Sequence, residues 1–208
     1  MDVSRQASAA VPERGPRART RRLMLVAATR LMQDGTIPSI TAVAEEADVS
    51  RATAYRYFPT QAALVHAVVD EALGPILDWH SESGDALERT QSLLSTSIPR
   101  IEDYEATFRA ALKHSLEQWA MRNAGVEMTE PAFTRGHRVS LLRDAVSPLT
   151  GRISDSSRER LAQALSLLFG IEALVILKDI WGIDGGEAKD VILWAAELLV
   201  TAASASEV

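Results

Sequence analysis

Apolar residues recur at intervals of three and four along most of the chain, which is the spacing of one face of an α-helix. The first such run begins at Arg17, places Leu23 and Val26 on one face, and stops at Gly35. No segment shows the strict alternation of a half-buried strand, and the chain is rich in Ala and Leu, which favour helices. The pattern therefore predicts an all-α fold.

Hydroxyl side chains mark the starts of three short helices that follow the first one. Ser39, Ser50 and Thr60 each precede an apolar run and can accept a hydrogen bond from a free N–H of the first turn. Pro59 ends the second of these helices, and Gly74 is expected to end or kink the third. The predicted ranges are residues 40–47, 51–58 and 61–73.

Proline and glycine divide the remaining sequence into five longer helices. These are expected at residues 85–98, 103–123, 132–147, 155–181 and 186–203, which makes about nine helices in all. Residues 1–16 mix Ser, Ala, Pro, Gly and Arg without an apolar period, and we expect a disordered arm there.

The composition removes several function classes. There is no Cys among the 208 residues, which excludes disulfide frameworks, thiolate nucleophiles and iron–sulfur clusters. The N-terminus lacks the apolar core of a signal peptide, so a cytoplasmic location is expected. The longest apolar stretch, Leu161–Leu177, is interrupted by Gln163 and Glu172 and is interpreted as a core helix, so no membrane partner is expected.

Charge is distributed unevenly. The chain carries a net charge of −6, yet residues 1–60 hold nine Arg against six acidic residues, which gives +3 there and leaves −9 for the remainder. A basic N-terminal part on an acidic body can bind a polyanion locally.

The two short helices at 40–47 and 51–58 have the features of a helix-turn-helix unit, which places its second helix in the major groove of DNA. Val43, Ala44 and Ala47 give the first helix a small apolar face, and Ala54 and Phe58 can bring the second helix onto it. Ser50 leaves the positive end of the second helix near the phosphates. This arrangement predicts a double-stranded DNA operator as a partner.

The same residues carry a resemblance to the TetR family of bacterial transcription regulators. The matching residues, which extend over about residues 20–70, are Ser39-Ile40, Val43-Ala44, Ala47, Val49-Ser50, Thr53, Tyr55, Tyr57-Phe58 and Leu64. The resemblance implies a helix-turn-helix DNA-binding domain at residues 17–64. It also implies a helical effector-binding and dimerisation domain at residues 65–208. The expected function is a ligand-responsive regulator, a repressor in the first instance, that binds a palindromic operator as a dimer and responds to an unknown small organic effector; whether the effector releases or promotes DNA binding stays open.

The expected DNA contacts divide into two sets, because phosphate contacts set affinity and base contacts set sequence preference. Backbone contacts are expected from Arg17, Arg19 and Arg22, and base contacts mainly from Arg51, Thr53 and Tyr57. The complete predicted interface also includes Ser39, Thr41, Ser50, Ala52, Tyr55 and Arg56. The alternative for these residues is an exposed helix in an ordinary bundle.

Three positions depart from the family pattern, and the first is Ala54, which replaces a larger aliphatic residue and predicts a slightly looser packing of the second helix. Asp48 stands where the family usually has Gly in the turn, and Asp tolerates a left-handed conformation better than most residues. Gln61 stands where the family commonly has a Lys that contacts phosphate. The last two departures leave open a second function, a helical small-molecule-binding protein or enzyme with a vestigial DNA-binding head.

No catalytic or metal motif accompanies the helix-turn-helix pattern. The four His residues are too scattered for a pair of metal ligands on one helix face, and we expect no metal, no cofactor and no enzymatic activity. A mostly apolar effector pocket is predicted instead, because polar groups in apolar runs need a partner. Its predicted wall contains Tyr104, Phe108, His114, Trp119, His137 and Glu172, although these groups could also satisfy one another or face solvent.

The last two long helices are apolar over more than one face, which indicates a second partner surface on each. We expect them to join two copies of the chain as an intermolecular four-helix bundle. The predicted contact residues of this homodimer are Leu167, Leu174, Ile192 and Leu198.

Overall fold

The computed structural model describes residues 15–126 and 136–205, and these residues form ten α-helices and no strand, so the all-α prediction is confirmed. The helices are α1 (Pro16–Leu31), α2 (Ile40–Glu46), α3 (Arg51–Tyr57), α4 (Gln61–Leu73), α5 (Ala86–Asp103), α6 (Glu105–Asn123), α7 (His137–Ala145), α8 (Asp155–Ser166), α9 (Ile171–Leu174) and α10 (Gly185–Ala205). Of the arm expected at residues 1–16, residues 1–14 lie outside the described part, and α1 already begins at Pro16.

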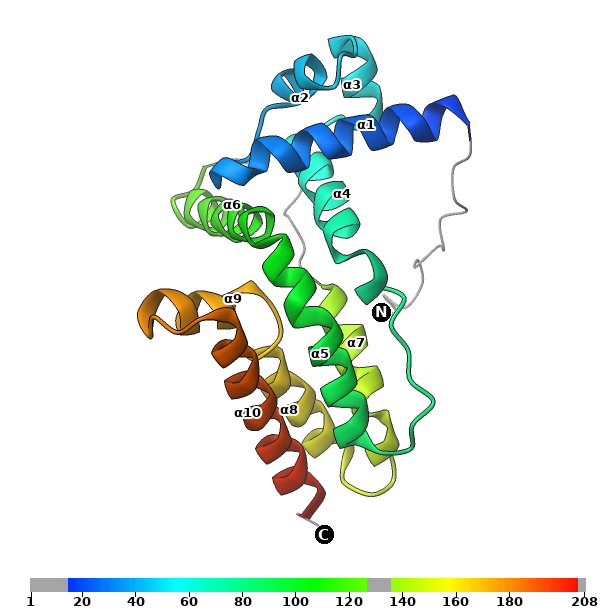
Figure 1. Cartoon of the computed structure of the whole chain (residues 1–208), viewed down its shortest axis with the longest axis vertical. Helices are drawn as coiled ribbons and strands as arrows, with labels where there is room; N and C mark the ends of the chain where they lie inside the picture. The colour runs from blue at the N-terminus through cyan, green and yellow to red at the C-terminus, as the bar shows by residue number, and fades with distance from the viewer. Residues whose placement is uncertain (1–14, 127–135, 206–208) are drawn as a thin grey trace.

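The molecule is elongated, with α1, α2 and α3 at one end and a helical body at the other (Figure 1). Helix α4 runs from the first group toward the body, where α5, α7, α8 and α10 lie beside one another. Helix α6 lies between α1 and α9 in both views, so it is placed between the N-terminal helices and the far part of the body.

The N-terminal helices have an apolar core of their own. Met24 and Leu25 of α1 and Met32 directly after it pack with Val43 of α2 and Phe58 after α3. Leu64 and Ala67 of α4 and Ala110 of α6 belong to the same cluster. The N-terminal unit is therefore packed directly onto α6 as well as being continuous with α4.

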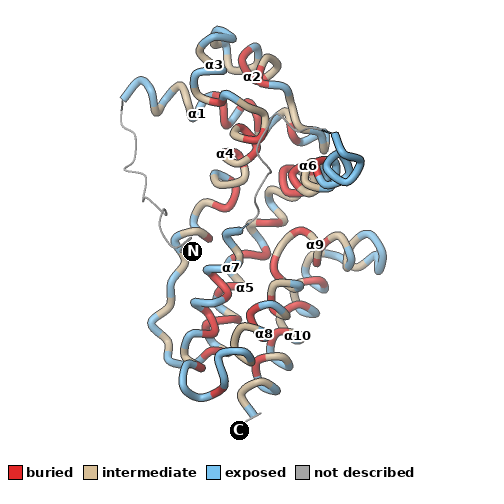
Figure 2. Tube along the Cα trace, turned by 180° about the vertical axis from the view of Figure 1, so that it is seen from behind, coloured by how far each residue is buried: buried red, intermediate tan, exposed pale blue. Residues whose placement is uncertain are grey.

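The body has a second and larger core, in which the long helices bury one face each (Figure 2). On α10 the buried side chains are Ala188, Ile192, Ala196 and Val200, spaced four residues apart. Residues with this spacing form a single stripe along a helix. One side of α10 thus faces the core of its own protomer, and the opposite side lies on the surface of the protomer.

Three helices differ from the sequence predictions. Of the helix expected at residues 132–147, residues 132–135 lie outside the described part, and α7 begins at His137 and ends at Ala145. Helix α5 continues through Pro99 to Asp103, because Pro99 lies on the exposed side, where the hydrogen bond that it removes can be replaced by water. The helix expected at residues 155–181 is broken at Gly170, whose φ of 121° is a conformation that only glycine adopts readily. The chain continues as α9 and a π-helical segment, Val175–Ile180.

Charged groups hold the π-helical segment against the end of α5 and the start of α6. Lys178 Nζ donates to Glu102 and Glu105 at 3.0 and 2.6 Å, and the Arg109 guanidinium binds both oxygens of Asp179 at 2.6 and 2.7 Å. Planar pairing of this kind is the stronger form of ion pair. The segment that follows α9 is therefore fixed to α6.

Among the described residues, no helix is by itself both long and apolar enough to cross a membrane. Only α8 and residues 171–180, taken together as a pair bent by 52°, reach that length and composition.

Candidate nucleic-acid interface and effector cavity

The crossing of α2 and α3 depends on small side chains and one unusual turn. Ala44 and Ala54 are completely buried between the two helices, where a larger side chain would push them apart. Asp48 has a φ of 52°, the left-handed conformation that the sequence predicted for this turn. Val49 donates its backbone N–H to the carbonyl of Ala44 at 2.9 Å and closes the turn.

Three side-chain caps fix where the helices of this unit begin. The hydroxyls of Ser39, Ser50 and Thr60 accept hydrogen bonds from backbone N–H groups three residues later, each at 3.1 Å. The caps on α2 and α3 matter most, because each of these helices has seven residues and is too short to be stable by its own hydrogen bonds. Ser50 therefore defines the position of the first turn of α3.

Helix α3 presents a polar face to solvent. Arg51, Ala52, Tyr55 and Arg56 are exposed, Thr53 and Tyr57 are half-buried, and Ala54 faces the core. Arg51 makes an ion pair with Glu45 at 2.9 Å, and because both side chains are about two-thirds exposed, this pair contributes little and can be exchanged for another partner. Ser39 and Ser50 are also exposed, and Thr41 is half-buried.

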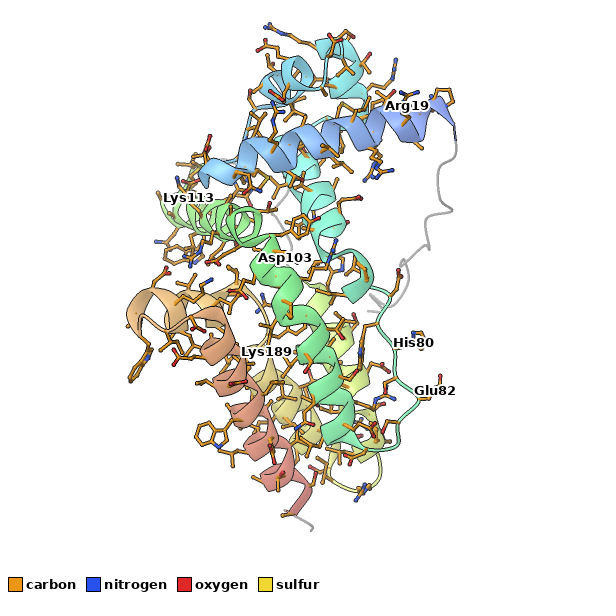
Figure 3. All side chains as sticks on the ribbon, in the orientation of Figure 1. Arg19, His80, Glu82, Asp103, Lys113 and Lys189 are labelled. Carbon is orange, nitrogen blue, oxygen red and sulfur yellow. The ribbon has the colours of Figure 1, made fainter. Side chains whose placement is uncertain are left out.

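The start of α1 is attached to the end of α3. The Tyr57 hydroxyl donates to the backbone carbonyl of Arg17 at 3.2 Å, and the Arg21 guanidinium lies over the Phe58 ring at 5.9 Å. Arg17, Arg19 and Arg22 are exposed on the first turns of α1, and Figure 3 shows Arg19 near that end of the helix. The structure therefore brings the predicted arginines to the same end of the molecule as α3.

Gln61, which stands where the family commonly has a phosphate-contacting Lys, makes two hydrogen bonds within the N-terminal unit. Its side-chain amide donates to the carbonyls of Ile37 and Pro38, at 3.4 and 3.2 Å, and so ties the start of α4 to the loop before α2.

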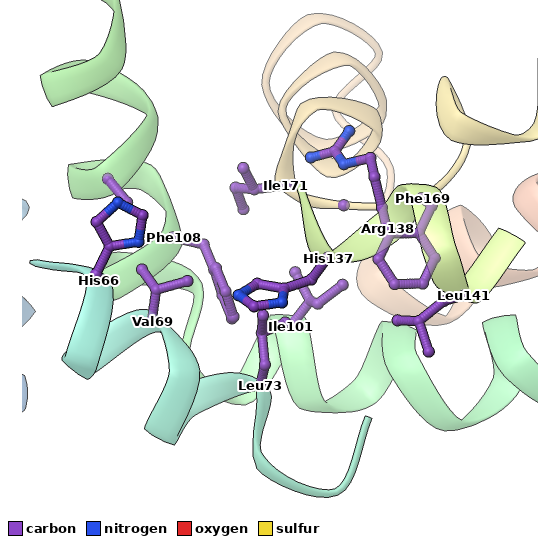
Figure 4. Close-up of a pocket in the computed structure, with 12 residues that line it drawn as sticks. His66, Val69, Leu73, Ile101, Phe108, His137, Arg138, Leu141, Phe169 and Ile171 are labelled. Atoms are coloured by element: carbon purple, nitrogen blue, oxygen red, sulfur yellow. The ribbon is translucent and has the colours of Figure 1, made fainter. Parts of the chain in front are cut away.

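A cavity of about 60 Å³ lies in the body directly below this unit. Its wall is drawn from α4, α5, α6, α7 and the start of α9, and most of the lining is apolar (Figure 4). The apolar side chains are Val69, Leu73, Ile101, Phe108, Ala111, Leu141, Phe169 and Ile171, and the polar ones are His66, His137 and Arg138. It is a partly open, mostly apolar site with a few polar groups, as small-molecule sites usually are.

The charged groups at this cavity occur in opposite pairs. His137 Nε2 lies 2.8 Å from Asp70 Oδ1, and Arg138 Nη2 donates to both oxygens of Glu172 at 3.1 and 3.0 Å. The hydrogen bond to Asp70 raises the pKa of His137, whereas burial lowers the pKa of His66. The pairs join α4 to α7 and α7 to α9.

The six predicted cavity residues are not all in one place. Phe108 and His137 line the cavity, and Glu172 reaches it through Arg138. Tyr104 instead packs under the Arg100 guanidinium at 4.9 Å, and Trp119 is 61% exposed at the far part of α6. His114 lies 3.2 Å from Gln118 and borders a separate polar depression beside Thr36 and Gln61. Tyr104, Trp119 and His114 therefore do not line this cavity.

The predicted dimer residues separate into two groups. Leu167 and Leu198 are exposed, but Leu174 and Ile192 are buried in the core of the protomer and offer almost no surface to a partner. The exposed apolar stripe of α10 is formed by Val191, Trp194 and Leu198, opposite to the buried one. Ile176, Ile180 and Trp181 extend the exposed apolar surface beyond α9.

Three cavity groups were missed as candidates by the sequence analysis. His66 and Asp70 are four residues apart on one helix, a spacing that brings side chains together and that could have marked them. Arg138 follows His137 directly, but its partner Glu172 is distant in sequence, so no local pattern identifies it. Within the part of the chain that the structure describes, no group of three or more His, Asp or Glu side chains could hold a metal ion.

Comparisons with known proteins agree with this geometry. Residues 24–68, which extend from α1 into α4, match the family model described as bacterial regulatory proteins, tetR family. The fold is similar to the crystal structure of a tetR-family transcriptional regulator from Streptomyces coelicolor, with a TM-score of 0.63, 17% sequence identity, and coverage of 91% of this chain and 83% of that chain. No curated protein matches the sequence.

Proposed function

We propose that this chain, a TetR-family transcription regulator by its N-terminal domain and its fold, is a dimeric repressor that releases a palindromic operator when a small organic effector binds in the body. The observation that carries the proposal is the position of α4. This helix follows the exposed α3 after three residues, contributes to the core of the N-terminal unit, and then lines the cavity.

The DNA-binding part of the proposal rests on α3 and the start of α1. Arg51 and Arg56 are exposed on α3, and Arg17 and Arg19 are exposed beside its C-terminal end. The proposed contacts are base edges for Arg51, Thr53 and Tyr57, and phosphates for the α1 arginines. The remaining predicted positions, Ser39, Thr41, Ser50, Ala52, Tyr55 and Arg56, lie on or beside the same face.

The dimeric part rests on the exposed apolar surface of α10 and the segment after α9. A monomer would leave Trp194, Leu198 and Trp181 in water, whereas a second copy placed about a two-fold axis would cover all of them. Two copies of α3 would then meet half-sites about one helical turn of DNA apart, roughly 34 Å.

Effector response follows from the way α4 connects the two regions. Leu64 and Ala67 on its first turns belong to the N-terminal core, while Val69 and Leu73 further along face the cavity. A ligand that moves the cavity wall therefore moves α4 and the α3 helix attached to it. A tenfold loss of operator affinity requires about 1.4 kcal/mol of difference in ligand affinity between the two arrangements.

The proposal is tested with DNA fragments selected from genomic DNA by the full-length protein. Fluorescence anisotropy then compares the double variant R51A/R56A with R152A/R160A, which removes two exposed arginines from the body. The first variant is expected to bind at least about tenfold more weakly, because base and phosphate contacts are lost, while the second binds like the parent. Equal affinity of the two variants would refute the assignment of α3.

A further inference from the structure

Five charged side chains join the corner between α5 and α6 to the π-helical segment that follows α9. Arg109 binds both carboxylate oxygens of Asp179, and its Nε donates to Glu105 Oε1 at 2.7 Å. Lys178 donates to Glu102 and Glu105. The hydrogen bond from Arg109 lowers the pKa of Asp179, and those to Glu105 and Glu102 raise the pKa of Lys178, so these groups are charged at neutral pH. We call these five residues the ionic network.

The π-helical segment has little apolar packing of its own. None of its six described residues is buried. Val175 and Leu177 are partly buried against the core of the body, whereas Ile176 and Ile180 are 49% and 75% exposed, and Trp181 directly after the segment is 73% exposed. A segment with so few buried apolar contacts has low local stability. The ionic network therefore supplies much of the attachment that apolar packing does not.

The same network reaches the start of α10. The Glu102 carboxylate lies against Gly185, the first residue of α10, where a Cβ would overlap it. An acidic group is favourable at this end of a helix. Since α10 carries Trp194 and Leu198, both parts of the proposed dimer surface, α10 and the segment after α9, are attached to the corner between α5 and α6.

Helix α6 connects this corner to the N-terminal unit. Ala110, the neighbour of Arg109, is buried in the N-terminal core with Met32 and Leu64. Successive residues of an α-helix are turned by about 100°, so one turn of α6 contacts the π-helical segment on one side and the N-terminal unit on another. Figure 1 shows α6 between α1 and α9. The position of the N-terminal unit relative to the proposed dimer surface therefore depends on α6 and on the ionic network.

We propose that the ionic network fixes the distance between the two N-terminal units of the dimer, and thereby selects the spacing of the operator half-sites. This proposal rests on the proposed function and specifies the operator geometry that the dimer accepts. Arg109 and Asp179 are positioning residues here, because they lie in the body and act through α6. One base pair more or less changes the separation of two half-sites by about 3.4 Å and their relative rotation by about 34°, so a small movement of each unit is enough to lose the register.

The distance is measured between two spin labels, one on each protomer of the full-length dimer, without DNA. The chain contains no Cys, so V26C labels an exposed position of α1, and R152C labels an exposed position of the body beside Val200 of α10. Double electron–electron resonance should give a narrow distance distribution at both positions in the parent. D179N should broaden the V26C distribution at least about twofold and leave the R152C distribution narrow, because only the N-terminal units gain freedom.

Two further variants separate positioning from a general loss of charge. D179E keeps the carboxylate that Arg109 binds and should restore the narrow V26C distribution. D78N removes the charge of an exposed Asp between α4 and α5 and should leave both distributions unchanged. A narrow V26C distribution in D179N, equal broadening at the two labels, or a monomeric D179N would overturn the proposal.

Operator fragments with one base pair inserted or removed between the half-sites test the consequence for recognition. By fluorescence anisotropy the parent should lose at least about tenfold in affinity for the altered fragments, whereas D179N should lose less than about threefold. Equal losses in the two proteins would contradict the role of the ionic network alone. A parent protein that binds no selected DNA fragment, or that shows no distance between labels because it is a monomer, would instead contradict the proposed function.

Discussion

Replacement of Leu198 by Glu is expected to convert the protein from dimer to monomer. Leu198 is 51% exposed in the protomer and lies on the apolar stripe of α10 with Val191 and Trp194. Because about half of its side chain is in water, the substitution should change the folding of the protomer little. Its effect should appear as a higher dissociation constant of the dimer.

The magnitude follows from the exposed fraction. Complete burial of a leucine side chain is worth about 1.5–3 kcal/mol, so covering the exposed half contributes about 1 kcal/mol, and an isologous interface counts it twice. A loss of about 2 kcal/mol raises the dissociation constant by about 30-fold. The glutamate adds the desolvation cost of an unpaired charge, several kcal/mol per ion, so the dimer should be lost at micromolar concentration.

Sedimentation velocity of the parent and of L198E measures this directly. The control is L23E, which places the same charge at a leucine of α1 that is 49% exposed, at the opposite end of the molecule (Figure 1). L23E should remain dimeric, and circular dichroism should show both variants folded. A dimeric L198E, or a monomeric parent protein, would refute the assignment of this stripe.

Three further outcomes are expected. S50A should lower the free energy of unfolding by about 1 kcal/mol in urea titrations, because α3 loses its cap, and it should also weaken operator binding. An unchanged free energy of unfolding together with unchanged operator affinity would show that the cap is not needed. D48G should raise stability by up to about 1 kcal/mol and D48V should lower it, because the position is left-handed; the reverse order would contradict the turn geometry. The stabilisation from the His137–Asp70 pair is fully present below the unfolded pKa of 6.5 and is lost as pH rises through the raised folded pKa of His137. D70N should therefore lower the melting temperature more at pH 6 than at pH 9, by a small amount because both side chains are nearly half exposed. An equal loss at the two pH values would exclude this linkage.

The sequence by itself determined the elements of the N-terminal unit. Ser39, Ser50 and Thr60 predicted the helix starts that the caps confirm, and Asp48 predicted the left-handed turn. These features depend on hydrogen bonds and steric limits within three or four residues, which are visible in a short stretch of sequence. The all-α class and the range of α4 follow from helical periodicity in the same way.

Local sequence rules predicted less well whether a proline or glycine interrupts a helix. Pro99 was expected to end α5, but its exposed position lets the helix continue. The helical period continues through Gly170, which predicts one long helix, yet Phe169 and Ile171 both pack into the core and the chain bends at the glycine between them. Whether such a residue interrupts a helix depends on which side meets the core, and that is a tertiary property.

Only the tertiary structure decided which apolar stripe faces the protomer and which groups meet at the cavity. Periodicity placed Leu174 and Ile192 on apolar faces as readily as Leu167 and Leu198, but the first two fill the core of the protomer and the last two remain outside. Arg138 and Glu172 are 34 residues apart and meet only because α7 packs beside the start of α9. A helix with two apolar faces carries no local signal for its partner, because burial is set by the elements that pack against it and not by the residues beside it in the chain.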